Sequence, residues 1–212
     1  MSKSFNDKFQ KGRTAFKMGF GLSHNASVSV PKGKFILTMT DSTTGEVLEH
    51  WEKDNVITND AGIQAARLFR NNAEPSNGVN MLSVGTGATG ALLSPDAPSA
   101  DQRRLNNEIA RKGFSSTTFR NQSGVAVAYP TNIVDFTATY GEAEAVGPLN
   151  EMGMLCTISD NVTIKNPNPN AYPLRDTTLD ITQYDVLVNY LTFSVVTKPS
   201  TAILTITWRL TF

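Results

Sequence analysis

The segment Leu204–Phe212, with the sequence LTITWRLTF, alternates apolar and polar residues without a break. Because successive side chains of a β-strand point to opposite faces, this period of two predicts a strand with one dry face. We expect the dry face to form part of the core through Leu204, Ile206, Trp208, Leu210 and Phe212. Burial of a residue as late as Phe212 would require this segment to be held in a sheet or against a neighbouring subunit.

Other segments carry the same period or a hairpin pattern. In GKFILTMTDSTTGEVLEHW, Phe35, Leu37 and Met39 alternate on one strand, residues 41–45 supply turn chemistry, and residues 47–51 form a return strand. Further strands are expected at residues 113–120, 124–128, 133–140, 151–158, 186–197 and 202–212. This pattern predicts a mainly β fold, either an antiparallel β-sandwich or a barrel-like domain, with one or two short helices.

The helices are expected in two places. In residues 58–70, Thr58, Asn59 or Asp60 can cap a helix that has a loosely apolar side. The sequence DQRRLNNEIARK, residues 101–112, predicts a second short helix with Leu105 and Ile109 facing inward. The sequence KNPNPNAYPLRD, residues 165–176, contains three prolines and is expected to be an exposed loop.

Charge and composition exclude several classes of protein. The sequence has 19 basic and 19 acidic residues, so we do not expect it to bind nucleic acid through bulk charge. Cys156 is the single cysteine, which excludes a scaffold held by disulfides within the chain. No apolar run reaches about 18 residues, and the first residues lack the apolar stretch and cleavage site of a secretion signal, so no membrane association is expected.

Residues 1–27 are predicted to be an N-terminal arm, followed by a single β-rich domain at residues 28–212. The arm contains five basic residues and one acidic residue, and its phenylalanines are Phe5, Phe9, Phe16 and Phe20. Their spacing would place them on one stripe of a helix that docks on a partner. Three glycines weaken that helix, and a mobile basic tail is the other interpretation.

The Gly-rich sequence GTGATG, residues 85–90, invites comparison with a phosphate-binding loop. It lacks the Lys-Ser/Thr pair of such a loop, and no helix is expected to begin at its last glycine. We therefore expect a tight structural loop that needs positive φ angles, and no nucleotide cofactor.

The sequence offers few residues for catalysis or metal binding. His24 and His50 are its only histidines, and Cys156 stands alone, so no metal-ligand spacing or Ser-His-Asp triad is expected. A glycosidase needs two carboxylates, and Glu142, Glu144 and Glu151 are the candidates.

No sugar-binding cleft accompanies these carboxylates, since Trp51 and Trp208 fall in expected core strands. Glu151 is instead expected to pair with a basic residue such as Arg111. The interpretation from these residues is that the protein has no catalytic, cofactor or metal site and is not an enzyme.

Five segments, taken in order, resemble a pattern found in virion proteins of tailed bacteriophages, namely tail-collar fibre, tail-fibre adaptor and baseplate or neck proteins. They are TGEVLEHWEKDNVITNDAGIQAARLF (44–69), LSVGTGATG (82–90), SADQRRLNNEIARKGF (99–114), VDFTATYGEAEAVGPLNEMGML (134–155) and LTFSVVTKPSTAILTITWRLTF (191–212). The sequence departs from the pattern at Met152 and Met154, and at Leu191, where the pattern has an arginine shortly before. The arm has no counterpart in it.

The resemblance implies a β-rich structural module without a catalytic site, which acts by assembly. It implies a homo-oligomer in the tail, baseplate or neck of a virion, made in the cytoplasm of a bacterial host, with other virion proteins as partners. A capsid decoration or head-fibre protein is the first alternative. A surface module that binds host carbohydrate is the second.

Overall fold

The strand predicted from LTITWRLTF lies in the middle of a large sheet. The computed structural model describes residues 31–70, 78–156 and 186–212, and in it the strand β12 (Ala202–Thr211) pairs with β1 (Lys32–Asp41) and β9 (Ile133–Tyr140). Both pairings are antiparallel. Buried and half-buried residues alternate along β12, as the sequence pattern predicts.

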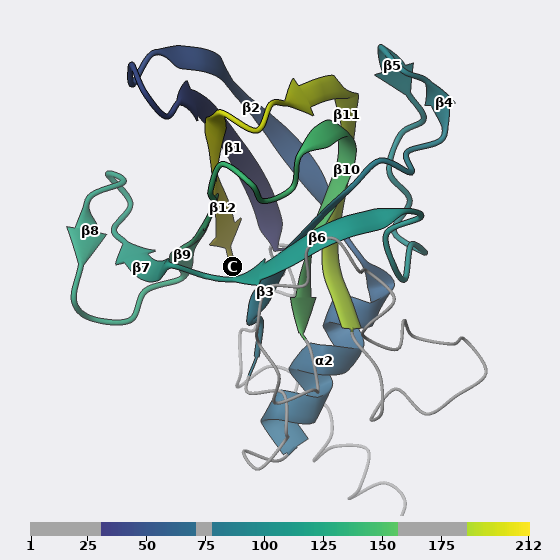
Figure 1. Ribbon diagram of the computed structural model, residues 1–212. Coiled ribbons are helices and arrows are strands. Elements are labelled where there is room, and N and C mark those ends of the chain that lie inside the picture. The colour runs from purple at the N-terminus through teal and green to yellow at the C-terminus, as the bar shows by residue number, and fades with distance from the viewer. Residues whose placement is uncertain (1–30, 71–77, 157–185) are drawn as a thin grey trace, which may run out of the picture. The chain divides into compact units, whose positions relative to one another are not determined.

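The sheet has ten strands, and Figure 1 shows how they are arranged. Its other strands are β2 (Val47–Ile57), β3 (Met81–Gly85), β6 (Glu108–Gly113), β7 (Ser116–Arg120), β8 (Ala126–Val127), β10 (Gly147–Cys156) and β11 (Val186–Lys198). Two further strands, β4 (Gly90–Ala91) and β5 (Ser94–Pro95), lie outside the sheet. In the large sheet the order is β6-β3-β10-β11-β2-β1-β12-β9-β7-β8, whereas β4 and β5 form a separate hairpin. All pairings are antiparallel, which confirms the predicted mainly β class.

The large sheet folds over on itself, so that its two halves enclose one core. Strand β2 belongs to both halves, because most of it pairs with β1 while its last two residues pair with Tyr190 and Asn189 of β11. At the other margin the chain runs from β6, which pairs with β3, into β7, which pairs with β9. The hydroxyl of Tyr140 on β9 donates a hydrogen bond across the core to the carbonyl of Leu82 on β3, at 2.9 Å. The result is a β-sandwich.

The first predicted helix is confirmed, and the second is wrong. Helix α2 (Asn59–Arg70) follows β2 and packs against β11. Residues 108–112 of the second expected helix, 101–112, instead form most of β6 (Glu108–Gly113). Pairing with the edge of β3 buries Ala110 in the core, while Leu105 packs in a separate cluster that includes Met81, so tertiary contacts override the helical pattern of this segment.

The expected role of Phe212 is also corrected. Four of the five predicted dry-face residues are buried, with exposed fractions of 0% for Leu204, Ile206 and Trp208 and 4% for Leu210. Phe212 is 57% exposed, because it lies one residue beyond the last pair of the β1–β12 ladder. Its backbone is nevertheless held, since its amide donates to Asn132 O at 2.9 Å and its carbonyl accepts from Asn132 Nδ2 at 2.7 Å.

A row of four aromatic rings crosses the core from one half of the sheet to the other. Trp208 of β12 packs edge-to-face on Phe35 of β1, with ring centroids 5.2 Å apart. Phe35 contacts Trp51 of β2, and Trp51 contacts Phe193 of β11, each also at 5.2 Å. Such contacts add to the stabilisation that comes from burial of apolar area.

The half-exposed face of β12 carries an ion-pair cluster around Asp135 of β9, which is 2% exposed. Arg209 donates two hydrogen bonds to its carboxylate, at 2.7 and 2.9 Å, and Arg120 of β7 donates one at 2.8 Å. Burial alone would raise the pKa of Asp135, but the hydrogen bonds and charges of the two guanidinium groups outweigh burial and lower that pKa. The cluster ties β7, β9 and β12 together on the side away from the core.

Residues Pro31–Phe212 form one compact unit. The predicted arm, residues 1–27 with its four phenylalanines, and the predicted loop 165–176 lie outside the described residues.

We predict that Trp208→Ala lowers the free energy of unfolding by about 3–5 kcal/mol, because it empties the centre of the core. Trp208→Phe should lower it less, since it keeps a ring against Phe35 and removes an indole N–H that is buried without a hydrogen-bond partner. Phe212→Ala is the control on the same face and should stay within about 0.5 kcal/mol of wild type. Chemical denaturation measures all three, and a Trp208→Ala curve that overlays wild type would contradict the central role of this residue.

The Asp135 cluster predicts a defined dependence of stability on pH. Because the folded pKa of Asp135 is lowered, its contribution is present above the unfolded value of about 3.9 and is lost as pH falls through the folded pKa. The difference in unfolding free energy between wild type and Asp135→Asn should therefore be constant from about pH 5 to 7 and shrink below about pH 4. In Arg209→Met the carboxylate of Asp135 should titrate at higher pH by NMR. A wild-type advantage that persists unchanged to pH 2 would refute this coupling.

Candidate functional site

A buried carboxylate lies where two loops meet strands β10 and β11. Glu151 of β10 is 0% exposed, and its two oxygens accept four hydrogen bonds. Oε1 accepts from the backbone amides of Gly87 and Asn107, at 2.8 and 2.7 Å. Oε2 accepts from the amide of Asn106 at 3.0 Å and from the hydroxyl of Tyr190 at 2.7 Å.

Further hydrogen bonds join the same loops around Glu151. Asn150 Oδ1 accepts from the amide of Ala88 at 3.0 Å. The side chain of Asn106 donates to Gly87 O, and that of Asn107 donates to the hydroxyl of Thr86, both at 3.0 Å. The loop after β3, the segment before β6 and the middle of β10 are thus one hydrogen-bonded unit, which we call the Glu151 cluster (residues 85–88, 106–107, 150–151 and 190).

The glycines of GTGATG serve close packing within this cluster. A Cβ on Gly87 would lie 2.4 Å from the amide nitrogen of Asn107 and 2.6 Å from Glu151 Oε1. A Cβ on Gly85 would lie 2.4 Å from the carbonyl oxygen of Asn107. Of the loop's glycines, Gly90 alone has a positive φ, of 92°. The expectation that this loop needs positive φ angles therefore holds at Gly90, whereas Gly85 and Gly87 are required for space.

The geometry also bears on whether the loop can take a phosphate. A phosphate loop offers free backbone amides to the anion, but here the amide of Gly87 already donates to the carboxylate of Glu151. An anion at that position would have to displace a buried negative group. The arrangement therefore favours the structural interpretation of GTGATG over nucleotide binding.

The expected pairing of Glu151 with Arg111 is wrong. Arg111 is fully buried and forms an ion pair with Glu108, three residues earlier on β6, in which Nη2 lies 2.6 Å from Oε2. Glu151 is instead satisfied by backbone amides and by Tyr190. Burial, the negative charge of Glu151 and the hydrogen bond to it all raise the pKa of Tyr190 above its ordinary value, so this hydroxyl keeps its proton and remains a donor.

The other candidate residues are scattered. His50 is exposed on β2 and shares a hydrogen bond of 2.9 Å with Thr38, Cys156 is buried, and His24 lies outside the described residues. Glu144 pairs with Lys112 at 2.6 Å. Burial alone would raise the pKa of Glu144, but the hydrogen bonds from Lys112 and Gly141 lower it. In the part of the chain that the structure describes, no group of three or more His, Cys, Asp or Glu residues is placed to hold a metal ion.

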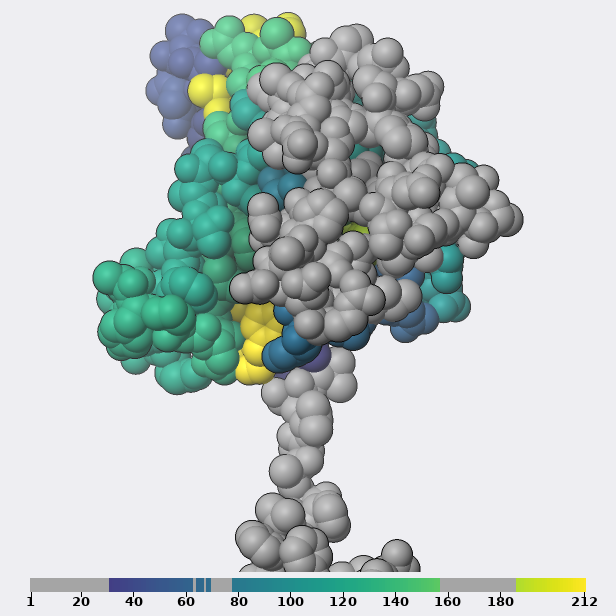
Figure 2. Space-filling view, turned by 90° about the horizontal axis from the view of Figure 1, so that it is seen from below, coloured from purple at the N-terminus to yellow at the C-terminus, as the bar shows by residue number. Residues whose placement is uncertain are grey.

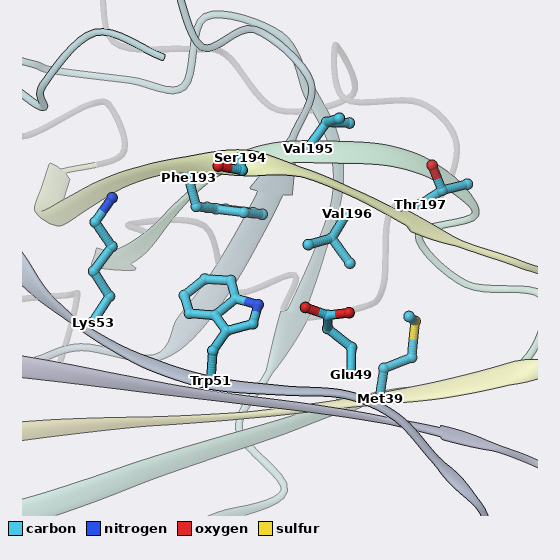
Figure 3. Close-up of a pocket in the computed structure, with 9 residues that line it drawn as sticks. All are labelled: Met39, Glu49, Trp51, Lys53, Phe193, Ser194, Val195, Val196 and Thr197. Carbon is cyan, nitrogen blue, oxygen red and sulfur yellow. The ribbon is translucent and has the colours of Figure 1, made fainter. Parts of the chain in front are cut away.

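A cavity of about 400 Å³ lies between β2 and β11, beyond the point at which these strands are hydrogen bonded. Figure 3 shows Trp51 and Glu49 of β2 facing Phe193 and Val196 of β11 across it, whereas the side chains of Val195 and Thr197 point away. The lining residues are Met39, Glu49, Trp51, Lys53, Phe193, Ser194, Val195, Val196 and Thr197. The cavity is thus lined by both apolar and polar groups, with the rings of Trp51 and Phe193 on opposite walls and the carboxylate of Glu49 beside them.

Both tryptophans were expected in core strands, and the sequence pattern did not predict this cavity. Trp208 is fully buried, but Trp51 is half-buried and forms part of the cavity wall. Glu49, Trp51 and Lys53 alternate on one face of β2, and an aromatic ring framed by two charged residues on a strand is the signal that would have indicated an accessible ring.

Comparison with protein-family models and with curated protein sequences finds no match. Among the residues that the structure describes, no helix is long and apolar enough to cross a membrane.

We predict that Gly87→Ala destabilises the protein by more than about 2 kcal/mol, because its Cβ would collide with backbone and with the Glu151 carboxylate. Gly62→Ala in α2 is the matched control, since a Cβ there meets nothing within 4 Å. That control should be stabilising by about 0.5–1 kcal/mol, because alanine is the better helix former. Thermal unfolding compares the two variants. Equal effects of the two substitutions would contradict the packing role of Gly87.

Proposed function

We propose that this chain is a structural component of a tailed-phage virion, in the tail, baseplate or neck, where it attaches or adapts a fibre. It acts as a homo-oligomer that contacts other virion proteins and catalyses no reaction. This proposal starts from the resemblance of five sequence segments to phage virion proteins, and the fold supplies a physical reason for their order.

The observation that supports the proposal best is the Glu151 cluster. It contains residues from three of the five segments that carry the resemblance, namely 82–90, 99–114 and 134–155. Its remaining member, Tyr190 of β11, immediately precedes a fourth segment, 191–212. The other segment, 44–69, supplies β2 and α2, both of which contact β11. Segments that share one hydrogen-bonded framework are expected to occur together in a sequence, whereas unrelated strand patterns are not.

The chemistry of the described residues is consistent with a role in assembly. The charged groups with the deepest burial are bound to partners within the fold, as Glu151 and Asp135 illustrate. Hairpins instead project from the sheet. Figure 1 shows β7 and β8 standing out on one side, and Figure 2 shows the same region as a protruding lobe. Val125 and Tyr129 of this hairpin are 58% and 62% exposed, which is typical of a contact surface rather than a core.

The second alternative, a carbohydrate-binding module, has one observation in its favour. The cavity between β2 and β11 combines an accessible indole, Trp51, with the polar side chains of Glu49, Lys53 and Ser194. Sugars are bound by aromatic faces and hydrogen-bonding groups, so this site is where a host glycan would bind. The capsid decoration alternative differs from the proposal only in the location of the protein on the virion.

The proposal predicts a discrete oligomer and a location. Light scattering on the purified full chain should give an integer multiple, greater than one, of its 23.0 kDa mass. Immunogold labelling of virions from producing cells should mark the tail, baseplate or neck.

Other outcomes separate the alternatives. Label over the capsid would favour the decoration protein, and a monomer that leaves virions unlabelled would refute the proposal. Glycan-array binding that Trp51→Ala abolishes would favour the carbohydrate module.

A further inference from the structure

The cavity between β2 and β11 opens at the end of the sheet where three turns meet. The amide of Ser42 donates to Thr201 O at 2.9 Å, which places the β1–β2 turn beside the β11–β12 turn. Lys198 Nζ donates to Gly141 O at 2.8 Å, which places the β9–β10 loop beside the end of β11. Residues 196 and 197 of the cavity wall immediately precede Lys198. We call the cavity together with residues 41–48, 141–147 and 198–202 the turn surface.

Exposed apolar side chains surround the cavity on the turn surface. Val47 and Leu48 are 56% and 42% exposed, and Val146 is 44% exposed. Beside the cavity, the β4–β5 hairpin exposes Leu92 and Leu93 by 67% and 76%. This hairpin is fixed to the cavity wall, because Leu92 O accepts from the amide of Val195 at 2.9 Å and Leu93 O from the hydroxyl of Ser194 at 2.7 Å. Exposed apolar groups gathered around a cavity mark a contact surface.

The charges of the turn surface are mainly negative. Its carboxylates are those of Asp41, Glu46, Glu49, Glu142 and Glu144, and its lysines are Lys53 and Lys198. Lys198 is buried and donates to backbone carbonyls, so its ammonium group faces inward. Of the carboxylates, Glu144 is paired by Lys112. The excess of negative charge favours a partner that is both basic and apolar.

Residues 1–27 of this chain have that composition. They carry four phenylalanines, five basic residues and one acidic residue. A fully extended chain of 27 residues spans at most about 90 Å, which is ample to reach an adjacent subunit. A cavity of about 400 Å³ is at the small end of the range for ligand sites, which suits an aromatic side chain as the anchor.

We infer that the turn surface of one copy binds residues 1–27 of a second copy, with a phenylalanine of that segment in the cavity and its basic side chains against the carboxylates. This inference rests on the proposed homo-oligomer and names the contact that would build it. Because the donated segment and the accepting surface are different parts of the chain, the contact is heterologous, and repetition of it gives a ring or a filament.

The test uses two variants of the full chain. The segment variant replaces Phe5, Phe9, Phe16 and Phe20 with serine and keeps the cavity. The cavity variant, Val196→Trp, fills the cavity, because the Val196 side chain points into it (Figure 3), and it keeps the segment. Ser123→Trp adds the same side chain at an exposed turn and is the control. Glu49→Lys, which reverses a rim charge without filling the cavity, is an independent second cavity variant.

The segment variant and the cavity variant, each measured alone, should lose the wild-type oligomer in sedimentation velocity. Both should keep the circular dichroism spectrum and the melting temperature of wild type. An equimolar mixture of the segment variant and Val196→Trp should regain one contact per pair and sediment as a dimer, because one partner supplies the cavity and the other supplies the segment. Glu49→Lys should weaken self-association at least tenfold, and Ser123→Trp should assemble like wild type.

Two outcomes would overturn the inference in different ways. If wild type, Val196→Trp and Glu49→Lys all form the same oligomer, the turn surface is not the acceptor, and the proposed homo-oligomer still stands. If wild type is itself a monomer at high concentration, the proposed homo-oligomer fails together with this contact.

Discussion

The arrangement of the loops depends on the buried carboxylate of Glu151. A charge removed from water is costly unless hydrogen bonds replace its hydration, and three backbone amides and the hydroxyl of Tyr190 do so here. The dependence is mutual, because the amides of Gly87 and Asn107 come from loops that are remote in sequence and would be left unpaired without the carboxylate. One side chain therefore fixes the loop after β3, the approach to β6 and the middle of β11, and it requires glycine where the chains come closest.

The same carboxylate lies beside the irregularity that shapes the cavity. Leu149 pairs with Val196 and Glu151 pairs with Thr192, so β11 contains two more residues than β10 over this stretch. Extra residues bend a strand and increase its local twist. The bulged residues include Phe193, which leans over Trp51 of β2 and forms one wall of the cavity (Figure 3). The Glu151 cluster and the cavity thus both adjoin this one irregularity of the β10–β11 pair.

Local sequence patterns predicted the elements whose structure follows from their own residues, such as a strand with one buried face or a helix with a capping residue. The alternation around Trp208 correctly indicated β12, and the capping residues before Ala61 correctly indicated α2. The prediction failed at residues 101–112, where pairing with β3 outweighs a helical pattern, and at Phe212, where the ladder ends one residue too early to bury the ring. The hydrogen-bond partners of Glu151 could not be predicted from sequence spacing. Three of the four are backbone amides, which every residue except proline carries, so no residue type identifies them.

The antiparallel ladder between β1 and β12 has a mechanical consequence. Lys32 pairs with Thr211 at one end of this ladder, and Asp41 pairs with Ala202 at the other. The hydrogen bonds of an antiparallel ladder run perpendicular to the strands. A pull on Lys32 against Thr211 would therefore open the ladder one pair at a time, at low force. If force were instead applied between Lys32 of β1 and Ala202 of β12, at the far end of the ladder, all ten pairs would be loaded together in shear. The sheet is weak in the first direction and strong in the second, so the point at which a neighbour grips it decides how much tension it bears.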